Sequence, residues 1–213
     1  MSAFNAISFN INNADQQLRS FKLWLSSVSF VGETAIVGEI KSRPQMACLL
    51  GATLGLQAPD LIKFELALKG MFKTDLVLGN NSTRTFGLVE FEDACCNSIF
   101  KKGTKQYRYW APRIEHGFSQ IIDWAWVRSD HPNDTVLING FGGQISTSSY
   151  IVICGRDASL NDDTERKRFA HRRSSMKVEG HPALIMTYDE MVNSMDDNLT
   201  VLKSYSSFGE SSG

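Results

Sequence analysis

The central part of the chain alternates apolar and polar residues with a period of two, and this pattern constrains the fold more than any other feature. In residues 61–68, LIKFELAL, an apolar side chain occupies every second position, as in a β-strand with one buried face. Lys69-Gly70 is typical of a tight turn. Two more strands, 71–79 and 85–93, flank the polar turn NNSTR. The centre is therefore predicted to form an antiparallel meander.

Helical patterns precede the meander. Residues 14–31 space their apolar side chains at close to 3.6 residues, which predicts an amphipathic helix opening at Asn13. Residues 33–40 and 44–54 predict two shorter helices, the second with Pro44 in its first turn. The first third of the chain is thus expected to be helical.

A different alternation follows the meander. Residues 114–127 predict a helix, 146–155 a buried strand, 164–173 a charged helix, 183–188 another strand and 189–195 a short helix. A strand, a helix and a second strand in succession are typical of a parallel pair. We therefore expect an α/β fold whose antiparallel meander has a parallel extension.

The length of the chain favours one main core. A chain of 213 residues that is 42% hydrophobic can bury a single good core. We divide it into a helical N-terminal segment, 1–58, that packs on the core, the core itself, 59–198, and a flexible Ser/Gly-rich tail, 199–213.

Composition excludes several classes of protein. With 22 basic and 23 acidic residues the formal charge is −1, so any contact with nucleic acid must come from a local patch. The longest apolar run, Met46–Leu56, is about half of the roughly 20 residues that a membrane helix needs, and the N-terminus lacks the pattern of a secretion signal. The four cysteines lack metal-site spacing and read as reduced thiols. We expect a cytoplasmic protein without membrane contact.

Three carboxylates lie where two neighbouring strands are predicted. Asp75 is surrounded by apolar residues, and Glu90 and Glu92 are two residues apart, so they share one face of a strand at a separation of roughly 7 Å. At that distance two carboxylates repel by about 2 kcal/mol at an effective dielectric constant near 20. A bound divalent cation would reverse this repulsion. The alternative is that the face is solvated and the acids are ordinary surface residues.

The predicted helix after the meander places polar side chains on one face. His116, Gln120 and Trp124 are spaced by four residues. Gln120 could therefore point toward the carboxylates. The alternative for His116 and Gln120 is a hydrogen-bonded structural role.

This order of features resembles the PD-(D/E)XK nuclease superfamily: an Asp, a hairpin turn, Glu-x-Glu, then a helix with Gln-x-x-x-Trp. More narrowly, the chain resembles the catalytic domain of the Shedu anti-phage nuclease family. The resemblance continues through four successive blocks that cover roughly residues 60–195. They are LVEFEDACCNSIFKKG, RIEHGFSQIIDWAW, YIVICGRDASL and ALIMTYDEMV.

The resemblance implies a restriction-endonuclease-like mixed sheet flanked by helices and a site that binds Mg²⁺, or Mn²⁺. Asp75 and Glu90 would be the metal ligands. Glu92 would occupy the position that usually holds lysine, Gln120 would be the helix glutamine, and Trp124 would take the aromatic position.

Glutamate in the lysine position is a departure from the superfamily pattern. Glu92 cannot stabilise a hydroxide as a lysine would, but it could bind a second metal or accept a proton from water. If the role of the lysine has moved, Lys101 and Lys102 are candidates, with a solvated turn as the alternative. Glu65 is a candidate supporting carboxylate, and Arg156, after a strand end, could orient a carboxylate or a phosphate.

One dense basic run, at 166–173, could neutralise phosphates or form a solvated helix face. Our leading hypothesis is a metal-dependent nuclease that acts on nucleic acid, most simply DNA, in bacterial defence against phage, and that assembles into a homo-oligomer. The rival hypothesis is a catalytically degenerate nuclease fold that binds nucleic acid or a protein partner.

Overall fold

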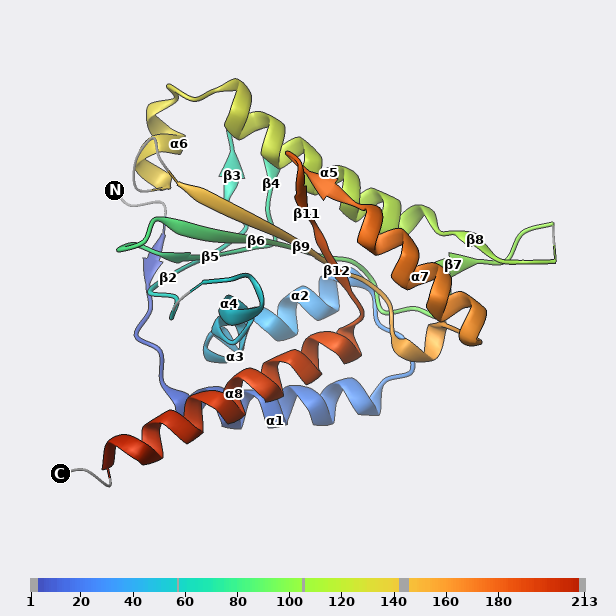
Figure 1. Cartoon of the computed structure of the whole chain (residues 1–213), viewed down its shortest axis with the longest axis horizontal. Coiled ribbons are helices and arrows are strands. Elements are labelled where there is room, and N and C mark those ends of the chain that lie inside the picture. The colour runs from blue at the N-terminus through green and yellow to red at the C-terminus, as the bar shows by residue number, and fades with distance from the viewer. Residues whose placement is uncertain (1–3, 57, 105, 142–145, 211–213) are drawn as a thin grey trace.

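A six-stranded mixed sheet lies at the centre of the computed structural model (Figure 1), which describes residues 4–210 apart from 57, 105 and 142–145. The strand order is β1-β2-β5-β6-β9-β12. The strands are β1 (Asn5–Ala6), β2 (Leu61–Phe64), β5 (Leu76–Asn80), β6 (Thr85–Phe91), β9 (Thr147–Ile153) and β12 (Leu184–Met186).

The pairing of the strands confirms the predicted combination of an antiparallel meander and a parallel extension. The pairs from β1 to β6 are antiparallel, whereas β6 pairs with β9, and β9 with β12, in parallel. The crossover from β9 to β12 contains α7 (Asp163–Ser175), whose first turn is capped by the side chain of Asp162. The sequence did not predict β1, through which the N-terminal segment contributes an edge strand.

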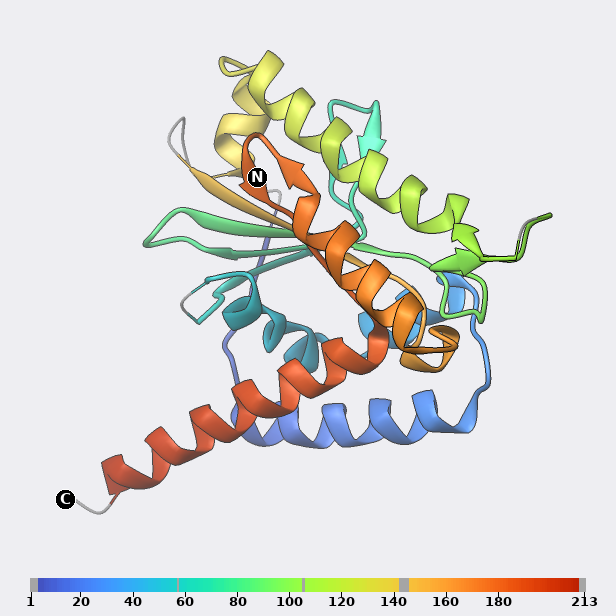
Figure 2. The same ribbon diagram turned by 45° about the vertical axis from the view of Figure 1, so that its right-hand side comes forward.

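Helices cover both faces of the sheet (Figure 2). One face packs against α1 (Ile11–Ser27), α2 (Glu33–Lys41), α3 (Pro44–Cys48), α4 (Leu50–Thr53) and α8 (Tyr188–Glu210). The other face packs mainly against α5 (Pro112–Asp130) and α6 (Thr135–Gly140). Because side chains alternate along a strand, Val89 and Phe91 belong to the first core, and Leu88 belongs to the second.

Three short hairpins lie outside the main sheet. They are β3 (Ala67–Leu68) with β4 (Phe72–Lys73), β7 (Phe100–Lys101) with β8 (Tyr109–Trp110), and β10 (Lys177–Val178) with β11 (His181–Pro182). A short 3-10 helix, η1 (Asp157–Ser159), follows β9. Within the described ranges, no helix combines the length and the apolar character needed to cross a membrane.

The predicted continuous strand 61–68 is wrong, because the chain turns at Glu65. Glu65 has a φ of 53°, in the left-handed region that interrupts a strand. Its N–H donates to the carbonyl of Asp75 (3.1 Å), so both strands of the meander break at the same level. Asp75 therefore precedes β5 and does not lie inside a strand as predicted.

The helices at the two ends of the chain also differ from the prediction. Helix α1 begins at Ile11, with Asn10 as its capping residue, two residues before the predicted start at Asn13. Helix α8 continues to Glu210, through most of the segment 199–213 that the sequence suggested as a flexible tail. The remaining domain boundaries stay predictions.

Candidate metal centre

The carboxyl end of β6 carries two buried glutamates. Glu90 is 2% exposed and Glu92 is fully buried. They alternate with Val89 and Phe91, which face the first core, so both glutamates face α5. The alternative that these acids lie on a solvated surface is therefore wrong.

Helix α5 places three polar side chains against these glutamates. Gln120 Nε2 donates a hydrogen bond to Glu90 Oε1. The Nδ1 atom of His116 lies 2.7 Å from Glu92 Oε1, and Arg113 Nη1 donates to Glu92 Oε2 at 3.3 Å. Because these residues are three and four positions apart, one face of the helix covers the end of the strand.

Gly117 allows α5 to approach this closely. A Cβ atom at this position would lie 2.8 Å from Val152 Cγ1 and 3.0 Å from Glu92 Cγ. Any side chain larger than that of glycine would therefore displace the helix or the buried glutamate.

Asp75 joins the cluster from the turn before β5. Its Oδ2 accepts a hydrogen bond from the Phe91 N–H at 2.8 Å, which fixes it beside β6. The pKa of Asp75 is raised to about 6, mainly by burial and also by the charge of Glu33, whereas the hydrogen bonds with the Phe91 N–H and Glu90 and the charge of Lys41 oppose this rise. The carboxylate lies in surroundings that disfavour its charge.

The pKa values of the two glutamates are raised as well. Burial raises the pKa of Glu90 to about 10, with further contributions from the negative charges of Asp75 and Glu92. Burial also raises the pKa of Glu92, although His116 and Arg113 partly offset that rise. The described cations near the cluster thus leave an excess of negative charge.

The donor set fits a divalent cation. Glu90, Glu92 and His116 each offer one ligand atom, and these atoms all lie within 4.8 Å of one another. Carboxylate oxygens suit Mg²⁺, and Mn²⁺ also accepts a histidine nitrogen. The sequence predicted Asp75 and Glu90 as the metal ligands. Asp75 lies outside the group of three but adjoins Glu90, so Glu90 belongs both to the predicted pair and to the group of three.

The structure brings the predicted catalytic residues together. Asp75, Glu90, Glu92 and Gln120 converge at one end of β6, and His116 reaches the same point. Trp124, one turn beyond Gln120, is fully buried in the second core. It supports the helix from inside the fold, where substrate has no access.

The other predicted supporting residues lie elsewhere. The side chain of Glu65 forms ion pairs with Lys41 and Lys73, both at 2.7 Å, and makes no described contact with Glu90 or Glu92, although its backbone N–H donates to the Asp75 carbonyl. Lys101 ends β7, and Lys102 follows it in the β7–β8 hairpin. Neither lysine makes a described ion pair with the cluster.

Arg156 follows β9 and forms an ion pair with Asp189 of α8 at 2.9 Å. It also donates to the carbonyl of Leu25 (2.9 Å), at the end of α1. Arg156 therefore joins two helices to the sheet.

Charged residues outside the predicted set also contact or influence the cluster, and Arg113 and Glu33 are two of them. Arg113 lies three residues before His116, so the helical spacing that identified His116 and Gln120 could also have identified Arg113. Glu33 begins α2, far away in sequence, and lies 3.4 Å from Arg113. No local pattern connects Glu33 to the site, because the contact depends on tertiary packing.

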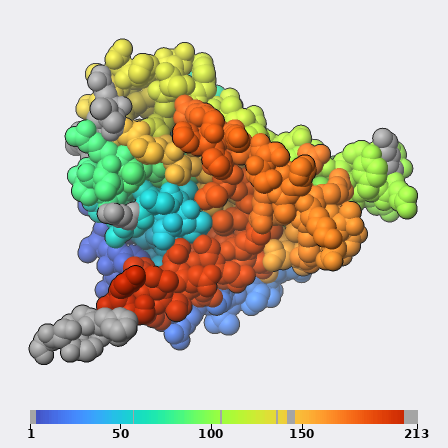
Figure 3. All heavy atoms as spheres, viewed as in Figure 1, coloured from blue at the N-terminus to red at the C-terminus, as the bar shows by residue number. Residues whose placement is uncertain are grey.

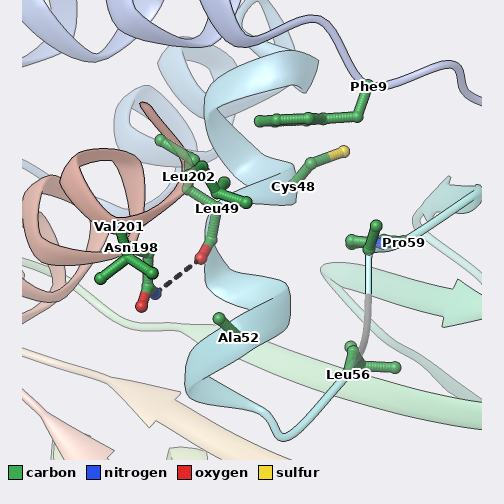
Figure 4. A pocket seen from close by; sticks show the side chains of 10 residues that line it. Phe9, Cys48, Leu49, Ala52, Leu56, Pro59, Asn198, Val201 and Leu202 are labelled. Carbon is green, nitrogen blue, oxygen red and sulfur yellow. Dashed lines mark hydrogen bonds between the residues drawn. The ribbon is translucent and has the colours of Figure 1, made fainter. Parts of the chain in front are cut away.

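An apolar groove on the opposite side of the sheet offers little chemistry. It has a volume of about 250 Å³ and is lined by side chains from α3, α4 and α8 (Figure 4). Its one thiol is Cys48, whose pKa is raised to about 12 by burial, so the thiol stays protonated and inert.

The fold and the site define an α/β protein in which a polar helix covers a buried acidic centre suited to a divalent cation. The chain belongs to the Shedu family: the family model described as Shedu protein SduA, C-terminal, matches residues 12–192. A search of the curated proteins found no match. The family that the sequence blocks suggested is thus confirmed, and membership points to a place in anti-phage defence.

Proposed function

We propose that this chain is a metal-dependent nuclease of Shedu type that cleaves DNA in bacterial defence against phage. The observation that carries the proposal is the burial of Glu90 and Glu92 against His116, with Asp75 adjacent. Burying several like charges costs free energy unless a cation compensates them. The PD-(D/E)XK assignment, the cytoplasmic location and the homo-oligomeric state remain predictions that accompany this function.

The cluster supplies the groups that phosphodiester hydrolysis needs. A divalent cation bound there would activate water and stabilise negative charge on the scissile phosphate. Gln120 orients Glu90 by donating to one of its oxygens. The His116 side chain is 57% exposed, so it extends from the buried acids toward solvent, from which substrate would approach.

Glu92 provides a reason why the usual lysine is dispensable. Its raised pKa and its contact with His116 suit a group that takes a proton from water. Arg113 supplies positive charge at the same carboxylate, with a side chain that is 45% exposed. A phosphate at the mouth of the site could accept from this guanidinium.

Arg113 also favours the rival function, a catalytically degenerate module that binds nucleic acid or protein. A cation that already contacts Glu92 partly compensates the charge that a metal would compensate. Arg113 makes no described hydrogen bond to Glu90 or Asp75, so its charge does not compensate these two acids directly.

The test is cleavage of labelled linear and circular DNA, with an RNA of the same sequence alongside, in Mg²⁺ or Mn²⁺. We expect Glu90→Ala and Asp75→Ala each to lower the rate by about 10³-fold or more, because several kcal/mol of transition-state stabilisation are lost. Glu115→Ala is the matched control, since Glu115 is an exposed acid on the same helix.

Cleavage that survives Glu90→Ala at the wild-type rate would overturn the proposal. Absence of cleavage by the wild type, together with intact binding of nucleic acid or of a partner, would support the degenerate module. Preference for RNA over DNA would show that the proposed substrate is wrong and that the proposed reaction, metal-dependent phosphodiester cleavage, is right.

A further inference from the structure

The β7–β8 hairpin projects from the body of the protein beside α7 (Figures 1 and 3). Its base adjoins the metal centre. The chain enters the hairpin soon after Glu92, and the Ala111 N–H, just past β8, donates to the Ile99 carbonyl at 2.9 Å. Two residues after Ala111, Arg113 contacts Glu92. The second strand of the hairpin therefore leads directly into α5, the helix that covers the site.

Two tyrosines form the aromatic part of this hairpin. Tyr107 is 53% exposed, and its ring centroid lies 5.6 Å from that of Tyr109. The Tyr109 ring packs on Gly103, where an added Cβ would lie 2.0 Å from a ring atom. The ring is thus fixed across the hairpin, and Tyr107 presents an aromatic surface to solvent next to it.

Two arginines of α7, one turn apart, extend this surface. Arg168 lies over the Phe100 ring at 4.6 Å and near Tyr107 at 5.6 Å, and Arg172 lies over Trp110 at 4.9 Å. Stacking uses the flat face of a guanidinium and leaves N–H groups at its edge for an acceptor. These contacts hold both cations in place beside the hairpin.

Lys102 and Tyr107 of the hairpin line a hollow of about 600 Å³ together with Arg168. We name Lys102, Tyr107, Tyr109, Arg168 and Arg172 the tyrosine–arginine surface.

The charges around this surface favour an anion. Arg108 and Glu165 pair at 2.9 Å, and their charges offset each other. The Asp162 side chain is held as the cap of α7. Among the other described side chains around this surface, four are basic and two are acidic. The basic ones are Lys101, Lys102, Arg168 and Arg172, and the acidic ones are Asp162 and Asp163.

We infer that the tyrosine–arginine surface binds a single-stranded segment of nucleic acid. Exposed aromatic rings stack on unpaired bases, whereas the bases of a duplex are already stacked on one another. The neighbouring cations neutralise the phosphates of the same strand. An acidic protein segment would match the cations but has no bases to stack on the tyrosines.

The delivery of the bound strand to the metal centre rests on the proposed function. The binding of the strand to this surface is independent of that function. It can be measured without divalent cations, so the two proposals can fail separately.

The experiment measures fluorescence anisotropy of a labelled 20-nucleotide single strand and of the matching duplex, in EDTA, with the full chain. We expect Tyr107→Ala to weaken single-strand binding about tenfold, since stacking contributes on the order of 1–3 kcal/mol per base and 1.4 kcal/mol is tenfold. Tyr107→Phe should bind like the wild type. Lys102→Ala should weaken binding about threefold and flatten its salt dependence.

Two control variants match these substitutions elsewhere on the surface. Tyr205→Ala removes an exposed tyrosine of α8, and Lys177→Ala removes an exposed lysine of β10. Both should leave binding within about twofold of the wild type. Thermal melts of each variant confirm that it is folded.

Equal single-strand binding by Tyr107→Ala and the wild type would overturn the inference. So would duplex binding as tight as single-strand binding, or absence of binding to both. Tyrosine-dependent binding of the single strand in a protein that cleaves nothing would uphold this surface and reject the nuclease.

Discussion

The adjacent parallel strands β6 and β9 each end in charged residues, but only the charges after β9 are balanced. There, Arg156 donates to both carboxylate oxygens of Asp189, at 2.9 to 3.1 Å. The Asp157 N–H donates to the same carboxylate at 2.7 Å. The charges of Arg156 and Asp189 offset each other, and this pair joins the end of β9 to α8.

At the end of β6 the acids exceed the cations. Glu90, Glu92 and Asp75 converge, and burial raises the pKa of each. The basic groups Arg113 and His116 are about half exposed and, of these three acids, have a described contact with Glu92 alone. This arrangement is stable only with protons or a metal ion in place of the missing positive charge.

The difference separates two uses of buried charge in one sheet. A balanced ion pair that makes several hydrogen bonds has a structural role, and it needs no bound ion or proton to be stable. An unbalanced cluster lowers stability by itself, and such clusters concentrate at functional sites. Substitutions in the two clusters should therefore have opposite effects on stability.

Asp189→Ala should be the most destabilising of these changes. It leaves Arg156 without its carboxylate partner, and breaking such a partly buried pair costs about 3 kcal/mol. For a chain of this size that lowers Tm by roughly 6 to 12 °C, measurable by differential scanning calorimetry. Below the transition, cleavage should stay within about twofold of the wild type.

The double variant Arg156→Met/Asp189→Leu is the control for this prediction. Replacing both charges by apolar groups should recover most of the lost stability. A folded Asp189→Ala protein that has lost cleavage would contradict the structural role assigned to this pair.

Glu90→Gln should stabilise the protein in EDTA at pH 8, on the order of 2 kcal/mol, because the pKa of Glu90 rises to about 10 on folding, so folding at pH 8 must protonate this acid, whereas an amide needs no proton. The amide oxygen still accepts from Gln120. Glu115→Gln, on the exposed side of α5, should leave Tm unchanged. A lower Tm for Glu90→Gln would show that the cluster is balanced after all.

The pH dependence follows from the same excess of acid. The folded-state pKa values, about 6 for Asp75 and about 10 for Glu90, lie above the ordinary values. Stability is therefore fully present below about pH 4 for these groups and is lost as pH rises through the folded values. In EDTA, Tm should fall between pH 5 and pH 8.

Mg²⁺ at 100 times its Kd should restore about 2.7 kcal/mol at pH 8. It should restore less at pH 5, where protons compete for the carboxylates. Glu90→Gln should reduce both the fall and the recovery. A Tm that neither pH nor Mg²⁺ changes would argue against an unbalanced site.

How far the sequence predicts this molecule depends on the range of the interactions involved. Short runs rich in apolar residues predicted β5, β6, β9 and β12 and the mixed sheet, because a strand that is buried on both faces is apolar at most of its positions. The break at Glu65 was missed, because its residues keep the alternation of a strand while the backbone turns.

The residues of the candidate site also differ in whether local sequence patterns could identify them. Gln120 and His116 could be predicted, because helical spacing places them on one face. Glu33 could not be predicted, because α2 meets α5 only through packing in three dimensions. Arg156 was expected near a phosphate or carboxylate, and its carboxylate is Asp189, 33 residues later in the chain.

Gly117→Ala should have the smallest effect and should test the site by geometry alone. The added methyl group would press on Val152 and Glu92. Overpacking of this kind costs about 1–3 kcal/mol, and the better helix propensity of alanine offsets up to about 1 kcal/mol of it. We expect a net loss of about 1 kcal/mol of stability, together with weaker Mg²⁺ binding by calorimetric titration, since Glu92 is displaced.

Gly38→Ala is the matched control, because nothing lies within 4 Å of its added Cβ in α2, and it should stabilise the protein without changing Mg²⁺ affinity. If Gly117→Ala lowered stability but bound Mg²⁺ like the wild type, Glu92 would not be a metal ligand, and the cation would then depend on Glu90 and Asp75, as the sequence first suggested.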